Sequence, residues 1–275
     1  MTRPYIPWLL LLLALVLAAL YLFPLYWMYV TSLKSASEIY ANPPTFWPLA
    51  PDLGIYPEVW IRRTMGTFLW NSVIIASGVT AITVILGTGC AYVLARYRSV
   101  WIDIGLFAIL MLQVLPASVM ITPLYVGFNQ IGLLNWPRTA VVLAAAAKSM
   151  PFFVVLVRAT FMSVPRELEE AALVDGNSRF GAFFSIVLPL ARNGILVCAI
   201  LTFMSAFGEY IYSKSIIQSP PLQPASVGLS GFLGPNSQDW ISIMAYSAIY
   251  VTPILAVFVL LQRRIVSGLT SGALK

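Results

Sequence analysis

Residue types that perform chemistry in proteins are sparse in this sequence. The chain has no histidine, which removes the usual general base and most metal sites. Its two cysteines, Cys90 and Cys198, lie inside separate apolar runs and do not suggest a disulfide framework. The phosphate-binding pattern G-x-x-x-x-G-K-[ST] does not occur. A nucleotide site of that kind, and with it ATP and Mg²⁺ as cofactors of this chain, is therefore not expected.

Lys148 and Glu209 are charged side chains that lie within apolar segments. Lys148 falls roughly 15 Å along its segment at the rise of an α-helix. A lysine at the centre of a bilayer costs at least about 2.5 kcal/mol, so it must face protein or water. Two interpretations remain open. Lys148 either pairs with Glu209 or with carbonyls freed by Pro151, or it lines a pathway and meets a polar or anionic group of a substrate.

The main acidic cluster comprises three glutamates between positions 167 and 170, followed by Asp175. Pro165 suits the first turn of a helix, acids favour the helix start, and Gly176 suits the left-handed position that ends a helix. The pattern predicts a short helix over 165–175. Its spacing places four residues on one face, on which alanine lets another backbone approach closely: Leu168, Ala171, Ala172 and Asp175.

A second helix is expected to follow at once, capped by Asn177 or Ser178 and ended by Pro189. It carries an apolar stripe of Phe180, Phe183, Phe184 and Val187. Together the two helices predict a helix–turn–helix on a membrane surface. One face would hold it to the membrane domain, and the other would fit a groove in another protein.

The elements that position these residues are apolar spans. The chain is 60% hydrophobic and 9% charged, with a mean hydropathy of +0.87, as in integral membrane proteins. Spans of about 20 residues cross a bilayer. We expect six within one all-α membrane domain, at 8–30, 71–95, 101–123, 139–161, 194–213 and 241–262, with loops at 163–193 and 214–240.

Positive charge orients these spans. Six crossings put both termini on one side, and ten of the sixteen Lys and Arg residues fall in segments on that side. Five fall on the other side, and Lys148 lies inside a span. The positive-inside rule therefore places both termini in the cytoplasm.

Two features indicate how the spans pack. Gly87, Ala91 and Ala95 leave one face of the second span nearly bare, so another helix can approach it closely. Pro116, Pro151 and Pro253 interrupt the third, fourth and sixth spans, each removing a backbone hydrogen bond. Such prolines fit either ordinary packing against neighbours or kinked helices that line a pathway.

The loop at 163–193 carries a resemblance to a known family. Glu170-Ala171-Ala172, Gly176, Ile186 and Leu188-Pro189 match the EAA motif of ABC importer permeases at every spacing. The strings "FPLYWMYVTSLKSASEIYANPPTFWP" at 23–48, "NSVIIA" at 71–76 and "IVSGLTSGALK" at 265–275 also resemble MalG-type permeases of carbohydrate importers. The resemblance covers nearly the whole chain.

The resemblance implies a type I ABC importer permease fold with a cytoplasmic coupling helix. It implies a non-enzymatic subunit of the bacterial or archaeal inner membrane that passes a sugar or sugar derivative inward by alternating access. The partners it implies are a second permease subunit, an ATPase dimer that carries ATP and Mg²⁺, and an external sugar-binding protein. Nucleic acid is not among them.

The resemblance also implies roles for particular residues. ATPase coupling falls to the EAA loop and the C-terminal tail, namely Glu170, Ala171, Ala172, Asp175, Gly176, Leu188, Pro189, Gly268, Leu269 and Thr270. Binding-protein contact falls to the loop at 214–240, with Gly228, Gly231 and Gly234. Lys148, Phe207 and Glu209 are candidates for the substrate pathway.

One stretch departs from the family. Members often carry Trp-Asn-Glu in the fifth span, where this chain has Phe207-Gly208-Glu209. Two other classes are weighed alongside the importer. A secondary transporter is expected to show paired intramembrane acids or broken half-helices in repeats, and a membrane enzyme a cluster of polar groups at one membrane face. The sequence shows neither pattern.

Overall fold

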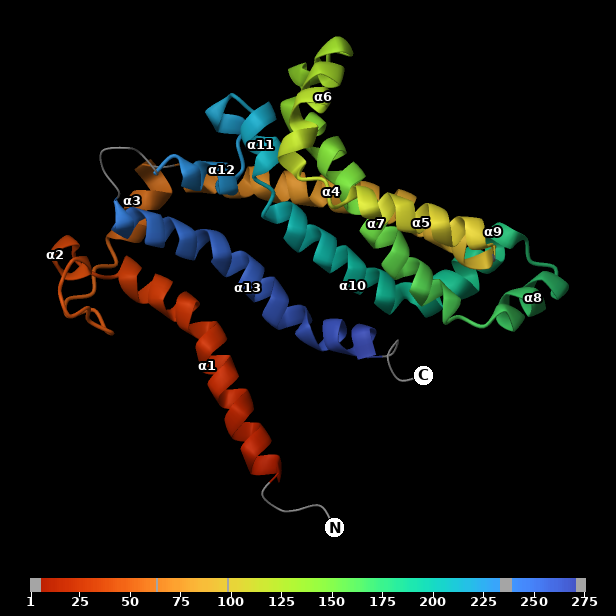
Figure 1. The fold of residues 1–275 in the computed structure, drawn as a ribbon, viewed down its shortest axis with the longest axis horizontal. Coiled ribbons are helices and arrows are strands. Elements are labelled where there is room, and N and C mark those ends of the chain that lie inside the picture. Colours follow the sequence, from red (N-terminus) through yellow and green to blue (C-terminus); the bar gives the residue numbers. More distant parts are fainter. Residues whose placement is uncertain (1–5, 63, 98, 233–238, 271–275) are drawn as a thin grey trace. The chain divides into compact units, whose positions relative to one another are not determined.

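The structure, a computed structural model, describes residues 6–62, 64–97, 99–232 and 239–270. Over these residues the chain forms helices and no strand, which confirms the all-helical membrane fold (Figure 1). In chain order they are α1 Ile6–Ser32, α2 Ala36–Ile39, α3 Ile55–Arg62, α4 Met65–Arg96, α5 Val100–Leu112, α6 Ala117–Gln130, a 3-10 turn Leu133–Asn135, α7 Pro137–Met162, α8 Arg166–Val174, α9 Arg179–Ala182, a π-turn Phe183–Val187, α10 Leu188–Phe207, α11 Ile211–Ile216, a 3-10 turn Pro220–Leu222, α12 Ala225–Ser230 and α13 Trp240–Thr270.

Five helical runs of the described chain are long and apolar enough to cross a membrane. The spans expected at 8–30, 71–95, 139–161 and 241–262 lie within α1, α4, α7 and α13. Pro151 and Pro253 lie inside α7 and α13, which continue through them.

The third span is not one helix. Residues 101–123 were expected to cross as a unit, but α5 ends at Leu112 and α6 begins at Ala117, and the two are bent by 95°. Pro116 occupies the N-cap of α6, where its ring and missing N–H are tolerated and the preceding helix cannot continue through it. The pair is either one broken span or a re-entrant loop.

The fifth span begins earlier and ends earlier than 194–213. It runs continuously from Arg179 to Phe207, so Pro189 does not end the helix as expected. A π-turn precedes the proline, and the N–H of Leu188 donates to the carbonyl of Phe183, five residues back. This wider turn shifts the hydrogen-bond pattern by one residue. Pro189, which has no N–H, therefore falls in the first turn of α10, where proline is tolerated.

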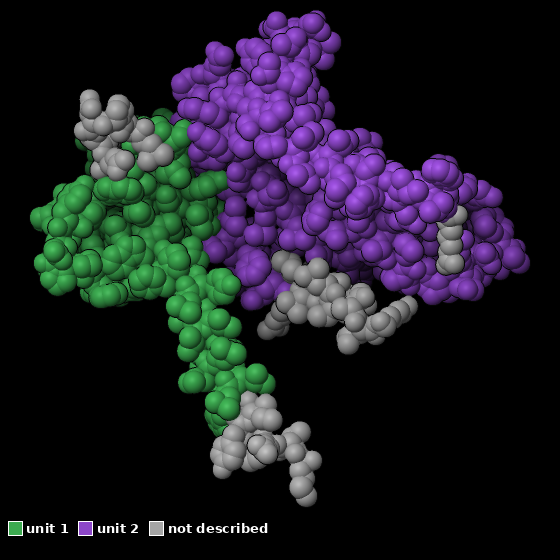
Figure 2. All heavy atoms as spheres, in the orientation of Figure 1, with its two compact units in different colours: residues 1–66, 228–253 green, residues 67–227, 254–275 purple. Residues whose placement is uncertain are grey.

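The chain divides into two compact units, which are coloured separately in Figure 2. The first comprises residues 1–66 and 228–253. Within it, the Tyr29 hydroxyl on α1 lies 2.7 Å from that of Thr252 on α13. Lys34 and Glu38 are buried, and they hold the irregular segment after α1 through the carbonyl of Thr45 and the N–H of Leu49. Satisfied buried charges of this kind give an ordered cap instead of a loose loop.

The second unit comprises residues 67–227 and 254–275, and α4, α7 and α10 form its core. Gly87, Ala91 and Ala95 of α4 are all buried, as the small-residue face predicted. A Cβ added at Gly87 would lie 2.6 Å from the ring of Phe153 on α7, and one at Gly194 of α10 would lie 2.5 Å from Thr160. Glycine is therefore required at both positions for the helices to pack this closely.

Candidate transport cavity and coupling helix

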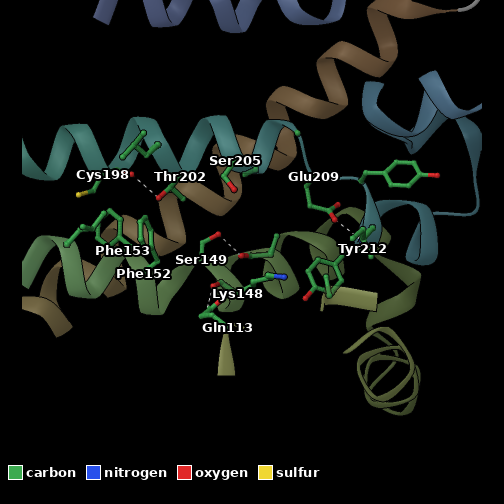
Figure 3. A pocket seen from close by; sticks show the side chains of 18 residues that line it. Gln113, Lys148, Ser149, Phe152, Phe153, Cys198, Thr202, Ser205, Glu209 and Tyr212 are labelled. Carbon is green, nitrogen blue, oxygen red and sulfur yellow. Dashed lines mark hydrogen bonds between the residues drawn. The ribbon is translucent and has the colours of Figure 1, made fainter. Parts of the chain in front are cut away.

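A cavity of about 620 Å³ lies within the second unit (Figure 3). Its walls come from α7, α10, α11 and the turn between α5 and α6. The lining residues are Gln113, Ala117, Ala145, Lys148, Ser149, Phe152, Phe153, Leu156, Cys198, Leu201, Thr202, Ser205, Ala206, Gly208, Glu209, Tyr210, Ile211 and Tyr212. Mostly apolar walls with a few converging polar groups are typical of small-molecule sites.

Glu209 lies beyond the end of the spanning helix and not within it. α10 ends at Phe207, and the Glu209 carboxylate accepts hydrogen bonds from the N–H groups of Tyr212 at 2.7 Å and Ser213 at 2.9 Å. The Ser213 hydroxyl donates a third bond at 2.5 Å. The acid thus caps the first turn of α11, where negative charge is favourable. Burial, and after it the negative charge of Glu209, raises the pKa of Tyr212 above its ordinary value.

Lys148 projects from α7 into the cavity, on the side facing Glu209 (Figure 3). The ion pair with Glu209 that the sequence left open is absent from the described residues. Instead, the Gln113 side-chain amide donates to the Lys148 carbonyl at 2.8 Å, close to the turn disturbed by Pro151. Sequence reasoning missed Gln113, and only the break before α6 brings it to this wall.

The other described residues expected in the substrate pathway and in the external contact loop do not line the cavity. Phe207 is buried and does not border the cavity. Gly228 lies within α12 and Gly231 just after it, whereas Gly234 lies outside the described residues. Gly268, Leu269 and Thr270 form the last turn of α13, and their side chains lie outside the described part.

The acidic helix expected over 165–175 is present as α8. Pro165 is its N-cap residue, and Gly176 has a φ of +88°, which confirms the left-handed position. The N–H of Gly176 donates to the carbonyl of Leu173 at 3.1 Å, and that of Asn177 to the carbonyl of Ala172 at 2.9 Å. This pair of bonds is a Schellman motif, which satisfies the last carbonyls of a helix. The next helix is capped by Ser178, whose hydroxyl accepts from the N–H of Gly181 at 3.0 Å.

α8 is bound to the end of α4 by a group of side chains that sequence reasoning did not single out. The Arg96 Nε lies 2.7 Å from a Glu169 carboxylate oxygen, and both side chains are mostly buried. Tyr92 also donates to Glu169, while Arg166 returns from α8 to the Arg96 carbonyl at 2.6 Å. Each of these bonds joins α8 to the last turns of a spanning helix. Side chains of both helices therefore fasten α8 to the end of α4.

The outward face of α8 differs in one respect from the expected one. Leu168, Ala171 and Asp175 are exposed and border a shallow hollow, but Ala172 is buried within this chain. Glu170 is exposed. Ala171, and not Ala172, is thus the alanine that a partner could reach.

The apolar stripe of the following helix is also divided. Phe180 and Phe184 are exposed, whereas Val187 is fully buried and Phe183 packs against Tyr92 and Phe161. The π-turn contributes to this division, because its extra residue rotates Phe180 relative to Val187. Leu188 and Pro189 of the motif begin α10.

This architecture defines a class of protein. A multi-pass helical membrane protein has a cavity among its spans and an amphipathic helix outside them, bonded to one span. Among the described residues, no group of three His, Cys, Asp or Glu side chains is placed to hold a metal ion. A cavity among apolar helices with an attached surface helix is compatible with a membrane transport subunit.

Comparison with known proteins gives the family. Residues 84–271 match the model of the binding-protein-dependent transport system inner membrane component, and the chain belongs to this family. Its members are membrane subunits of ABC importers and not enzymes, which sets aside the membrane enzyme and the secondary transporter. Membership implies partnership with an ATPase and a binding protein.

Individual relatives agree with this assignment. The sulfoquinovosyl glycerol transport system permease protein SmoH of Agrobacterium fabrum is 34% identical over 255 residues, covering 92% of this chain and 89% of that protein. The trehalose/maltose transport system permease protein MalG of Thermococcus litoralis is 32% identical over an alignment that covers 95% of this chain and 94% of that protein. A crystal structure of a bacterial ABC transporter involved in the import of the acidic polysaccharide alginate has the same fold, with a TM-score of 0.78 at 19% identity. The match covers 96% of this chain and 98% of the chain in that structure.

Proposed function

We propose that this chain is the permease subunit through which an ATP-driven importer passes a sugar or sugar derivative into the cytoplasm. The cavity between α7 and α10 carries the proposal, because it offers polar groups to a solute between apolar helices. Relatives named for transport of trehalose and maltose or of a sulfoquinovosyl glycerol support a carbohydrate cargo.

In this proposal α8 is the coupling helix. Its exposed face, with Glu170, Ala171 and Asp175, enters a cleft of an ATPase subunit, and Gly176 sets the turn that presents it. Closure of the ATPase dimer displaces α8, and the Arg96–Glu169 pair passes the displacement to α4. Leu188 and Pro189 secure the return of the chain into α10, and Gly268, Leu269 and Thr270 place the C-terminal tail at the ATPase.

The proposal includes a second permease subunit, paired with this one across the pathway, and both termini in the cytoplasm. On the external side, the segment at 214–240 meets the binding protein, with Gly228, Gly231 and Gly234 permitting a close approach. Lys148 and Glu209 border the pathway, and Phe207 supports its wall from behind.

Crosslinking tests the coupling assignment. The complex is purified in detergent from the native host, in a background without Cys90 and Cys198, and a cysteine is placed at Ala171 or at Ala172. Cysteines are also placed along the cleft of the co-purified ATPase. We expect disulfides from position 171 and few from position 172, because only the first is exposed. Failure to crosslink at any cleft position in an assembled complex would contradict the assignment.

A further inference from the structure

The cavity has an unbalanced charge. Among the described residues that border it, only Lys148 and Glu209 carry charge. At first sight the two cancel, but they are not joined by an ion pair. What each group contacts therefore decides which charge a solute in the cavity meets.

The carboxylate of Glu209 is already fully engaged by its own chain. It accepts two backbone N–H groups from the first turn of α11 and the hydroxyl of Ser213. Three donors directed at two oxygens stabilise the anion where it stands. A solute entering the cavity consequently meets a carboxylate whose negative charge is largely compensated.

The ammonium of Lys148 has no such partners. Its side chain makes no hydrogen bond or ion pair with any described residue. The nearby hydroxyls donate to their own helices, that of Ser149 to Ala145 at 2.9 Å and that of Thr202 to Cys198 at 2.9 Å. An unpaired cation among membrane spans is costly and marks a functional site by default.

From this asymmetry we infer that the imported sugar carries an acidic group, a carboxylate, sulfonate, sulfate or phosphate, that pairs with Lys148. The inference rests on the proposed function and specifies its substrate class. Lysine suits a moving ligand, because a compact cation on a flexible stem accepts an anion from several directions. Phe152 and Tyr210, which are 57% and 40% exposed, border the same cavity and offer ring faces to the sugar.

The test uses the complete complex, with its ATPase, second permease subunit and binding protein, in proteoliposomes. The probes are matched sets: a neutral hexoside, the corresponding hexuronoside and the corresponding 6-sulfonate, each as mono- and disaccharide. Uptake and stimulated ATP hydrolysis are measured for wild type and for Lys148→Met, Lys148→Arg and Lys148→Glu. Arg62→Met is the control, because it removes a positive charge from an exposed side chain that does not border the cavity.

We expect the acidic sugars to be transported in preference to the neutral ones. Lys148→Met should reduce acidic uptake by about tenfold or more, the loss that accompanies one charged hydrogen bond. Lys148→Arg should retain most of it, Lys148→Glu should lose more, and Arg62→Met should behave as wild type. The ratio of acidic to neutral uptake is the decisive reading, since a structural defect lowers both together.

Two results would overturn the inference, and they differ. If neutral sugars are transported as well as acidic ones and Lys148→Met keeps their ratio, the anionic class is wrong and sugar import stands. The anionic class is equally wrong if Lys148→Met prevents assembly of the complex and Lys148→Arg transports both classes equally. If the assembled complex transports neither class, the proposed function itself fails.

Discussion

Gly176 sets the geometry of the surface that we propose docks to the ATPase. At a φ of +88° it ends α8 in a left-handed turn, which turns the chain toward Ser178 and the next helix. A Cβ built at Gly176 would meet no atom within 4 Å. Space therefore does not select glycine here. The backbone conformation does, because side chains disfavour a positive φ and β-branched ones most of all.

Replacing Gly176 should therefore follow backbone preference and not side-chain size. We expect Gly176→Asn to retain most uptake, Gly176→Ala to lose part, and Gly176→Val to lose nearly all, with the protein inserted at normal levels in each case. Uptake and ATPase co-purification are measured together. Gly105→Ala, in α5 and equally free of steric contact, is the control. Normal uptake by Gly176→Val would show that this turn does not present the docking surface.

Between elements, α4 packs against the cavity wall and also holds α8, the proposed coupling helix. Its middle packs on α7 through Gly87, and its last turns hold α8 through Tyr92 and Arg96. Phe153 both contacts this face of α4 and lines the cavity. α4 thus contacts both a residue of the cavity wall and α8. Its contact with α7 and its contact with α8 can be tested separately.

Where α4 packs on α7, Gly87→Ala should destabilise the protein by about 1–3 kcal/mol, the usual effect of overpacking. The added Cβ would lie 2.6 Å from the Phe153 ring. Gly89→Ala is a matched control two residues away, where nothing lies within 4 Å of the new atom. Thermal unfolding in detergent measures both. Equal unfolding temperatures for the two variants would contradict the close packing of α4 on α7.

Where α4 holds α8, Glu169→Gln should weaken the attachment of α8 by about 2 kcal/mol, as expected for hydrogen bonds to a charged group. The Arg96 and Glu169 side chains are largely shielded from solvent, so water and salt screen their attraction only modestly. The expected functional result is fewer sugar molecules imported per ATP hydrolysed, because motion of the ATPase is passed on less completely. Glu167→Gln, on the exposed first turn, is the control. An unchanged ratio of transport to hydrolysis in Glu169→Gln would argue against this route.

For the whole molecule, the number of membrane crossings depends on α5 and α6. Five helical runs of the described chain are long and apolar enough to cross a membrane. The bent pair of α5 and α6 adds a sixth crossing only if it counts as one span. Six crossings put the termini on one side, whereas five put them on opposite sides.

Because Lys and Arg concentrate on the side of both termini, we expect the bent pair to cross. Fusions at either end should then be fluorescent with green fluorescent protein and inactive with alkaline phosphatase. A phosphatase inserted between α6 and α7 should be active. Active phosphatase at one terminus alone would show that α5 and α6 form a re-entrant loop.

The membrane class, four of the spans and the turn that ends α8 could all be predicted from the amino-acid sequence. Each of these depends on local properties: apolar length, the proline and acids that begin α8, and a glycine at its end. The close packing face at Gly87, Ala91 and Ala95 was also predictable, since four-residue spacing of small residues places them on one side of a helix.

The partners of the polar groups, in contrast, depend on how the helices pack in three dimensions. Glu209 could equally have paired with Lys148, and the early end of α10 directs it to the N–H groups of α11 instead. Glu169 is one of three neighbouring glutamates, and the position of Arg96 selects it for the bond to α4. The 95° bend brings Gln113 to the carbonyl of Lys148. Contacts such as these join residues that are far apart in the chain or depend on where a helix ends, so the spacing of residues along the sequence does not predict them.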